Sequence, residues 1–203
     1  MPTPATIRRD PRNNGKGIST YHGFTVIEFM ISLAVLAIIT SLAVPSYRTI
    51  LEKRQVTSAA EQLMAFLSAV QIESVKRNER LAVSYSRAAA DSWCVGFTTN
   101  VAGCDCTKGV ADANACVVDG RLRVFSNANL NHPGIMDGIT GDGGFVYDPV
   151  RGLMQDHADA LTLELLSPDE HHYALNVEVT ATGRIKICSK DGAGAVPGYA
   201  TCS

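Results

Sequence analysis

The sequence predicts an α+β fold, in which a long N-terminal helix packs on a C-terminal β-sheet head. Three observations lead to this prediction. An apolar run, residues 24–44, precedes a helical stripe of apolar residues; short runs of β-type residues follow from Leu81 onward; and all six cysteines lie in that β-type region, from Cys94 onward. At 203 residues, the chain has room for one globular domain and a targeting segment.

The first segment, residues 1–23, is polar, with several prolines and basic residues and a single acid, Asp10. The next segment, 24–44, is apolar and long enough, at about 1.5 Å per residue, to cross a bilayer core of roughly 30 Å. Basic residues before this span and few after it place the N-terminus in the cytoplasm. We therefore expect a transmembrane helix over 24–44, with everything after it translocated.

One carboxylate, Glu28, interrupts the apolar run, at a cost of about 2.5–3.5 kcal/mol on insertion scales. The segment Gly23-Phe24-Thr25-Val26-Ile27-Glu28 followed by an apolar run resembles the leader signal of type IV prepilins. The resemblance implies that a prepilin peptidase removes residues 1–23 by cutting after Gly23. It also implies N-methylation of the new N-terminal residue, Phe24, while the helix stays attached to the head.

The resemblance also gives Glu28 a role in assembly. In a filament, this carboxylate would neutralise the Phe24 amine of a neighbouring subunit and fix the register between adjacent helices. Two plainer interpretations compete. A secretory signal peptide cut near Ser41-Leu42-Ala43 would have a shorter apolar core, and an ordinary single-pass anchor leaves the Gly-Phe-Thr-x-x-Glu pattern unexplained.

Residues 45–79 are predicted to form the amphipathic, periplasmic half of the long helix, ending near Asn78. Pro45 predicts a kink or a short melted stretch where this half begins. The predicted buried stripe consists of Val56, Ala60, Leu63, Leu67 and Val70. The predicted outer face carries Glu52, Lys53, Arg54, Gln55 and Glu61.

Residues 80–203 are predicted to form one compact β-sheet head. Short apolar runs mark the expected strands at 81–85, 93–97, 122–125, 145–147, 161–166, 173–179 and 184–187. Glycine and proline mark the stretches 129–144 and 148–152 as turns.

The cysteines are Cys94, Cys104, Cys106, Cys116, Cys188 and Cys202. Their even number in Gly- and Ala-rich loops favours disulfides in an oxidising compartment, in agreement with a periplasmic head. Zinc binding is the alternative, but Cys104-Asp105-Cys106 is tighter than the usual ligand spacing. Spacing alone leaves three ways of pairing the first four cysteines.

Three segments of the head resemble the GspH/FimT/FimU group of minor pilins and pseudopilins: 145–149 (FVYDP), 182–188 (TGRIKIC) and 196–202 (VPGYATC). The resemblance implies a pilin-like fold and a C-terminal loop closed by Cys188 and Cys202. It implies a minor pilin of the inner membrane, single-pass with a periplasmic head, that joins other minor and major pilins and primes a type IV pilus. The alternative is pseudopilin H of a type II secretion system.

A second hypothesis is DNA binding, because some FimT-type minor pilins bind DNA through a Gly-Arg-x-Arg motif. Gly183-Arg184-Ile185-Lys186 resembles that motif, with Lys190 close by. Arg184 and Lys186 would project from one face of a strand. A net charge of −2 favours the plainer interpretation, a strand that displays solvated basic residues after a turn glycine.

The sequence predicts no enzyme activity, cofactor or metal site. His157, His171 and His172 lie near acidic residues, but no spacing typical of metal ligands or of a catalytic nucleophile accompanies them. Asp137–Asp142 resembles a calcium loop only loosely.

Overall fold

The chain divides into two compact units, Met1–Ala43 and Val44–Ser203. The computed structural model describes residues 23–89, 92–130, 135–137, 141–156, 161–167 and 173–202, without the side chains of 42–46, 88–89, 135–137 and 141–142. The predicted leader, apart from Gly23, lies outside the described residues.

One helix, α1 (Val26–Arg77), contributes to both units. It ends where the sequence predicts, because Asn78 takes a left-handed conformation (φ 51°) and Glu79 N–H bonds the carbonyl of Ser74 at 3.2 Å. Pro45 lies within α1, but its side chain is not among those described. The kink expected at Pro45 therefore stays a prediction. Within the described residues, no helix has the combination of length and apolar character needed to cross a membrane.

The amphipathic half of α1 presents its predicted stripe to the head. Val56, Ala60, Leu63, Leu67 and Val70 are fully buried, and this prediction is confirmed. The predicted outer face is wrong at Glu52, which is only 4% exposed. Glu52 lies four residues before Val56, one helical turn away, so it shares the buried face.

The head contains two four-stranded antiparallel sheets and a small hairpin, where the sequence predicted one sheet. The first sheet has the order β5-β2-β1-β7 and the second β10-β9-β8-β6, while β3 and β4 pair separately. The strands are β1 (Leu81–Ala89), β2 (Ser92–Thr98), β3 (Val117–Val118), β4 (Arg121–Leu122), β5 (Val124–Ser126), β6 (Ile135–Asp137), β7 (Gly141–Tyr147), β8 (Leu161–Leu166), β9 (Ala174–Val179) and β10 (Ile185–Ser189); a 3₁₀ turn, η1 (Asn127–Asn129), follows β5.

The stretch 129–144, predicted as turns, contains β6 and the first part of β7. Glycine lowers intrinsic strand propensity, but Gly141–Gly144 pair along β1, opposite Arg87–Ser84. These strands depend on distant partners that a local pattern does not reveal. The expected run 122–125 is likewise divided between β4 and β5.

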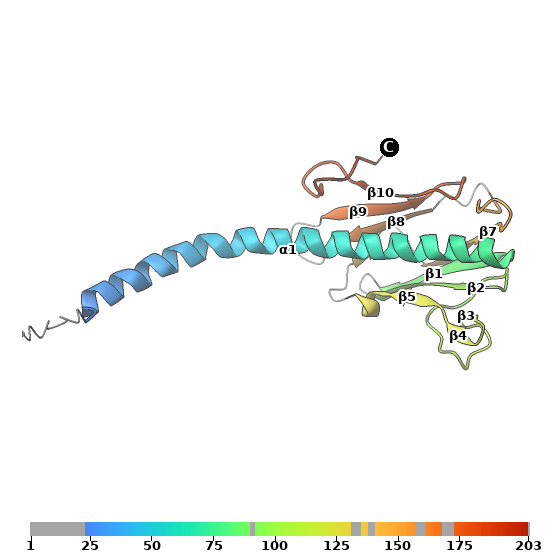
Figure 1. Ribbon diagram of the computed structural model, residues 1–203, viewed down its shortest axis with the longest axis horizontal. Helices are drawn as coiled ribbons and strands as arrows, with labels where there is room; N and C mark the ends of the chain where they lie inside the picture. Colours follow the sequence, from blue (N-terminus) through green and yellow to red (C-terminus); the bar gives the residue numbers. More distant parts are fainter. Residues whose placement is uncertain are drawn as a thin grey trace, which may run out of the picture. The chain divides into compact units, whose positions relative to one another are not determined.

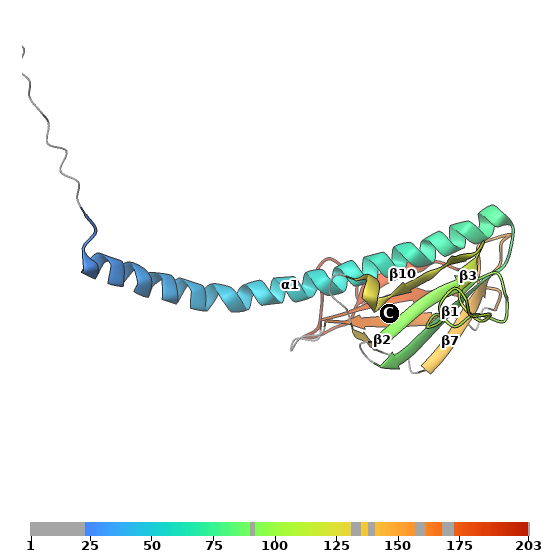
Figure 2. The same ribbon diagram turned by 90° about the horizontal axis from the view of Figure 1, so that it is seen from below.

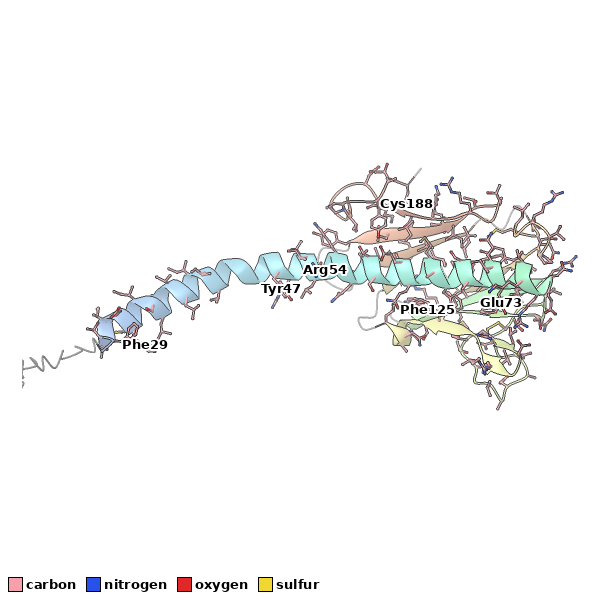
Figure 3. All side chains as sticks on the ribbon, viewed as in Figure 1. Phe29, Tyr47, Arg54, Glu73, Phe125 and Cys188 are labelled. Carbon is pink, nitrogen blue, oxygen red and sulfur yellow. A yellow bond between two sulfur atoms is a disulfide. The ribbon has the colours of Figure 1, made fainter. Side chains whose placement is uncertain are left out.

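A single apolar core joins the second half of α1 to both sheets (Figures 1 and 2). Phe66 on the helix stacks on Phe125 of β5 at 5.7 Å between ring centroids, and Trp93 of β2 lies 5.8 Å from Phe125. Figure 3 labels Phe125. The second sheet contributes Leu163, Leu175 and Val177, all fully buried. The helix thereby holds the two sheets as one head.

Candidate functional site

The predicted processing segment lies directly before α1. Gly23, Phe24 and Thr25 are exposed and outside the helix. Among the described residues beyond its chain neighbours, no atom lies within 4 Å of the position where a Cβ of Gly23 would be. Thr25 is the N-cap: its carbonyl accepts from Phe29 N–H at 3.1 Å and its hydroxyl accepts from Glu28 N–H at 3.3 Å. The peptide bond that a peptidase would cut is therefore in non-helical, accessible chain.

The first turns of α1 carry Glu28 among exposed apolar side chains. Phe24 is 86% exposed and Phe29 is 61% exposed. Figure 3 labels Phe29 near the start of α1. Glu28 lies in the first turn, where a carboxylate interacts favourably with the free N–H groups of the helix. Among the described residues 23–41 of this unit, all side chains are exposed.

One segment of the head resemblance, 182–188, meets the 148–152 turn at one glutamine. Gln71 of α1 donates to the carbonyls of Gly152, at 2.6 Å, and Gly183, at 3.1 Å. Gly183 is buried with φ +72°, and a Cβ there would lie 2.3 Å from the Gly152 carbonyl oxygen. The glycine of the predicted Gly-Arg-x-Lys motif thus has a packing role: it lets the 180–183 turn approach the 148–152 turn.

The six cysteines form three disulfides: Cys94–Cys106, Cys104–Cys116 and Cys188–Cys202. The third is the pairing that the family resemblance implied. The first two each join residues twelve apart: Cys94–Cys106 ties the 99–116 loop to β2, and Cys104–Cys116 closes that loop on itself. Cys94, Cys106 and Cys116 are buried together. The loop is thus cross-linked to the sheet that it covers.

The C-terminal loop closed by Cys188–Cys202 packs against α1. Val196 is 4% exposed within the main core, and the Tyr199 hydroxyl donates to a carboxylate oxygen of Glu61 at 2.8 Å. Partial burial, and secondarily this hydrogen bond, raise the pKa of Tyr199. The loop therefore joins the end of the chain to the helix.

The basic residues of the DNA-binding hypothesis are mostly paired. Lys186 Nζ lies 2.8 Å from Glu178 Oε2, and Lys190 Nζ lies 2.5 Å from Glu164 Oε1. Both carboxylates are largely buried, at 17% and 12% side-chain exposure. Arg184 is exposed. Close carboxylates offset the attraction of both lysines for phosphate, so the arrangement disfavours a phosphate-binding strand.

A family model described as type II transport protein GspH matches residues 59–183, more than half of the chain. The chain belongs to the GspH family. The match begins in the buried stripe of α1 and ends at Gly183, so it covers most of the helix–head core and both glycines that Gln71 joins. GspH-family proteins are pilin-type structural proteins rather than enzymes, and this chain is a type IV minor pilin or pseudopilin of that family.

A second model, the prokaryotic N-terminal methylation motif, matches residues 18–44. Its presence implies processing by a prepilin peptidase. Crystal structures of the type IV minor pilin FimU of Pseudomonas aeruginosa are similar: one at 15% identity and TM-score 0.44, covering 73% of this chain and 96% of that one. A second crystal form gives 15% identity and TM-score 0.41, covering 70% and 98%. No curated protein matches the chain.

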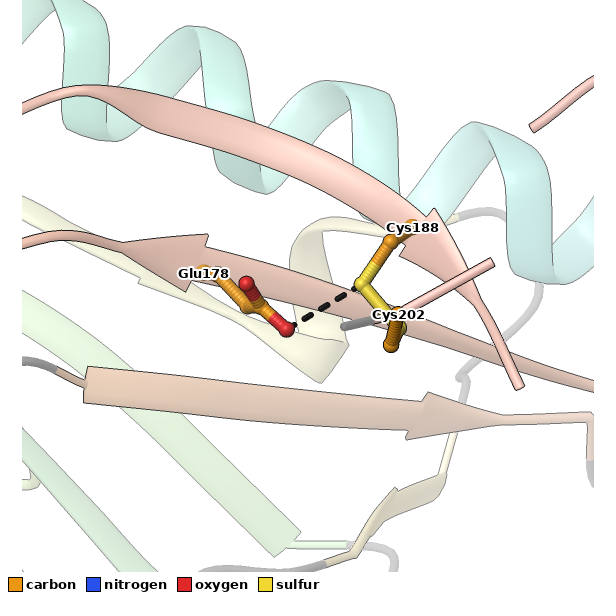
Figure 4. Close-up of side chains that lie close together, drawn as sticks. All are labelled: Glu178, Cys188 and Cys202. Carbon is orange, nitrogen blue, oxygen red and sulfur yellow. Dashed lines mark hydrogen bonds between the residues drawn. A yellow bond between two sulfur atoms is a disulfide. The ribbon is translucent and has the colours of Figure 1, made fainter. Parts of the chain in front are cut away.

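Among the described residues, Glu178, Cys188 and Cys202 bring metal-ligating atoms close together (Figure 4). Glu178 Oε1 lies 3.2 Å from Cys188 Sγ. Both sulfurs are bonded to each other, so neither is a thiolate, and metal binding by cysteine requires the thiolate. This cluster is therefore a disulfide beside an ion pair. His157, His171 and His172 lie outside the described residues.

Sequence reasoning missed three residues that organise these sites. Thr25 begins α1, Gln71 joins two turns, and Glu178 pairs with Lys186. The Thr25-Val26-Ile27-Glu28 spacing is a recognisable capping-box pattern and could have indicated the helix start. Nothing local marks Gln71 or Glu178, because their partners are distant in the sequence.

Proposed function

We propose that the chain is a minor pilin that is anchored in the inner membrane by residues 24–44 and co-assembles into, or primes, a type IV pilus. The leader 1–23 is removed by a prepilin peptidase between Gly23 and Phe24, and the new amine at Phe24 is methylated. The observation that carries the proposal is the processing motif on an apolar helix that continues directly into a GspH-family head.

Assembly in this proposal depends on Glu28. Hydrolysis leaves a charged amine on Phe24, and a neighbouring subunit's Glu28 neutralises it among apolar helices. Each charge is costly alone in an apolar environment, and pairing reduces that cost. The apolar side chains of 24–41, exposed in the isolated subunit, supply the rest of the helix–helix contact.

Mass spectrometry of the chain extracted from membranes tests the processing step. We expect a mature N-terminus at Phe24 with one added methyl group and all six cysteines oxidised. A chain that begins at Met1, or beyond Ala43, would overturn the proposal. Glu28→Val should leave cleavage intact and abolish co-assembly with the other pilins, and Ser32→Ala, another position on the anchor, is the matched control.

The family description names type II transport, so a pseudopilus subunit of a type II secretion system is the second candidate. Deletion of the gene distinguishes a pilus subunit from a pseudopilus subunit. Loss of surface pili with normal protein secretion supports the pilus, and loss of secretion with normal pili supports the pseudopilus.

A further inference from the structure

We propose that Thr25 is a positioning residue for leader removal: its hydroxyl fixes the start of α1 and so keeps the Gly23–Phe24 bond outside the helix. This inference rests on the proposed function, since it concerns the same cleavage step. It assigns Thr25 a role that neither the scissile glycine nor the assembly carboxylate supplies.

The hydrogen bonds at the helix start carry the argument. Phe29 N–H bonds the carbonyl of Thr25 at 3.1 Å, the first regular bond of α1. Glu28 N–H bonds the Thr25 hydroxyl at 3.3 Å. In a helix extended by one residue, the same Glu28 N–H would instead bond the carbonyl of Phe24, following the i to i−4 rule. The Thr25 hydroxyl thus takes the donor that would propagate the helix toward the leader.

The next step of such propagation would involve the scissile bond itself. Ile27 N–H would bond the Gly23 carbonyl, and that carbonyl would then lie along the helix axis, enclosed by the following turn. In the structure, Gly23 is exposed and outside the helix, and Phe24 is 86% exposed. The capped arrangement leaves the carbonyl free for attack.

Hydrolysis requires that the Gly23 carbonyl be free of helical hydrogen bonds. Water adds to the Gly23 carbonyl carbon, the carbon–nitrogen bond to Phe24 breaks, and the nitrogen leaves as the protonated amine of the mature chain. The leader leaves with a carboxylate at Gly23. A carbonyl already hydrogen-bonded within a helix is held in a geometry that the addition must first undo, so helix propagation over Gly23 slows the step.

A different account is that the peptidase contacts the Thr25 side chain directly. Substitutions that separate shape from capping distinguish the two. Thr25→Val keeps the shape and lacks the acceptor, whereas Thr25→Ser and Thr25→Asn change the shape and are good N-caps. If capping matters, T25V is cleaved more slowly than T25S and T25N. If the peptidase recognises the shape of the side chain, T25S and T25N are cleaved more slowly than T25V.

The experiment follows leader removal from the full chain in membranes that also contain a prepilin peptidase. We expect cleavage of T25V to be about fivefold slower than wild type, the factor that corresponds to about 1 kcal/mol of capping free energy. T25S and T25N should be cleaved no more slowly than wild type. Equal rates for T25V and wild type, or T25S and T25N as slow as T25V, would overturn the inference.

A second measurement reads the helix start itself. In NMR spectra of the uncleaved chain in detergent micelles, the Glu28 amide should be protected from exchange in both forms, and the Ile27 amide only in T25V. Helical carbon chemical shifts should likewise reach Phe24 and Gly23 only in T25V. Helical shifts that begin at Val26 in both forms would contradict the mechanism. If the wild-type chain is not cut after Gly23 at all, the proposed function fails instead.

Discussion

Tyr147 has a buried hydroxyl for which the described residues supply no hydrogen-bond partner. Its ring packs edge-on against Phe145, at 5.1 Å between centroids, so the side chain is held by apolar contacts. Burial raises the pKa of Tyr147 above its usual value near 10. The hydroxyl therefore costs free energy of folding, and ionisation of the phenol would cost more.

We predict that Tyr147→Phe leaves the free energy of unfolding unchanged or raises it by about 1 kcal/mol near neutral pH, because it removes an unsatisfied polar group. A tyrosine whose pKa is raised by folding contributes stability below its unfolded pKa and loses it as pH rises above about 10. Urea unfolding at pH 8 and at about pH 10.5 should show a smaller alkaline loss in Y147F than in wild type. An equal alkaline loss would contradict this account.

Gly183 has a left-handed backbone and lies close to the Gly152 carbonyl. A side chain at Gly183 would therefore cost free energy through backbone strain and through a clash, and these two costs can be measured separately. Gly183→Ala should lower the free energy of unfolding by roughly 3 kcal/mol, from backbone strain and from the clash with the Gly152 carbonyl. Gly120 has nearly the same φ, +71°, and nothing lies within 4 Å of the position that a Cβ would take there, so Gly120→Ala should cost only about 1 kcal/mol. Similar losses from both substitutions, measured by urea unfolding, would show that the approach of the two turns does not matter.

At the scale of elements, the sequence pattern predicted those features of the helix that depend on interactions between residues close in the chain. The stripe from Val56 to Val70 and the end of α1 near Asn78 follow from helical periodicity and capping. β6 and the glycine-rich start of β7 could not be predicted, because their strand conformation comes from pairing with β8 and β1. The candidate cleavage motif was readable because its residues are adjacent in the chain, whereas the Gln71 junction joins residues 81 and 112 positions away.

The C-terminal loop should depend chiefly on its disulfide. Replacing both Cys188 and Cys202 by Ser should lower the free energy of unfolding by about 3 kcal/mol, since the crosslink restricts the unfolded chain. Tyr199→Phe removes only the hydrogen bond to Glu61, and we expect a loss of about 1 kcal/mol. Urea unfolding of the 44–203 fragment without reductant measures both. A larger loss from Y199F than from the double substitution would mean that the helix contact, rather than the crosslink, holds the loop.

At the scale of the whole molecule, surface charge bears on whether the head also binds DNA. The sequence placed Arg184, Lys186 and Lys190 near one another, but it could not show that Glu178 and Glu164 lie beside the two lysines. These carboxylates come from β9 and β8, and strand pairing brings them to the same face of the sheet as the lysines. The chain as a whole also carries a net charge of −2.

We therefore predict that the 44–203 fragment gives no gel shift with duplex DNA at about 0.1 M salt, because ion pairing leaves few cations to release phosphate counterions. Glu164→Gln with Glu178→Gln should free Lys186 and Lys190 and produce a shift that weakens steeply as salt increases. Thr162→Ala, two residues before Glu164 on β8 and paired opposite Glu178, is the matched control because it changes no charge. A wild-type shift that disappears in Arg184→Gln/Lys186→Gln would contradict the prediction and would restore DNA binding as a function of this surface, since ion pairs at partly exposed positions are weak enough for phosphate to displace.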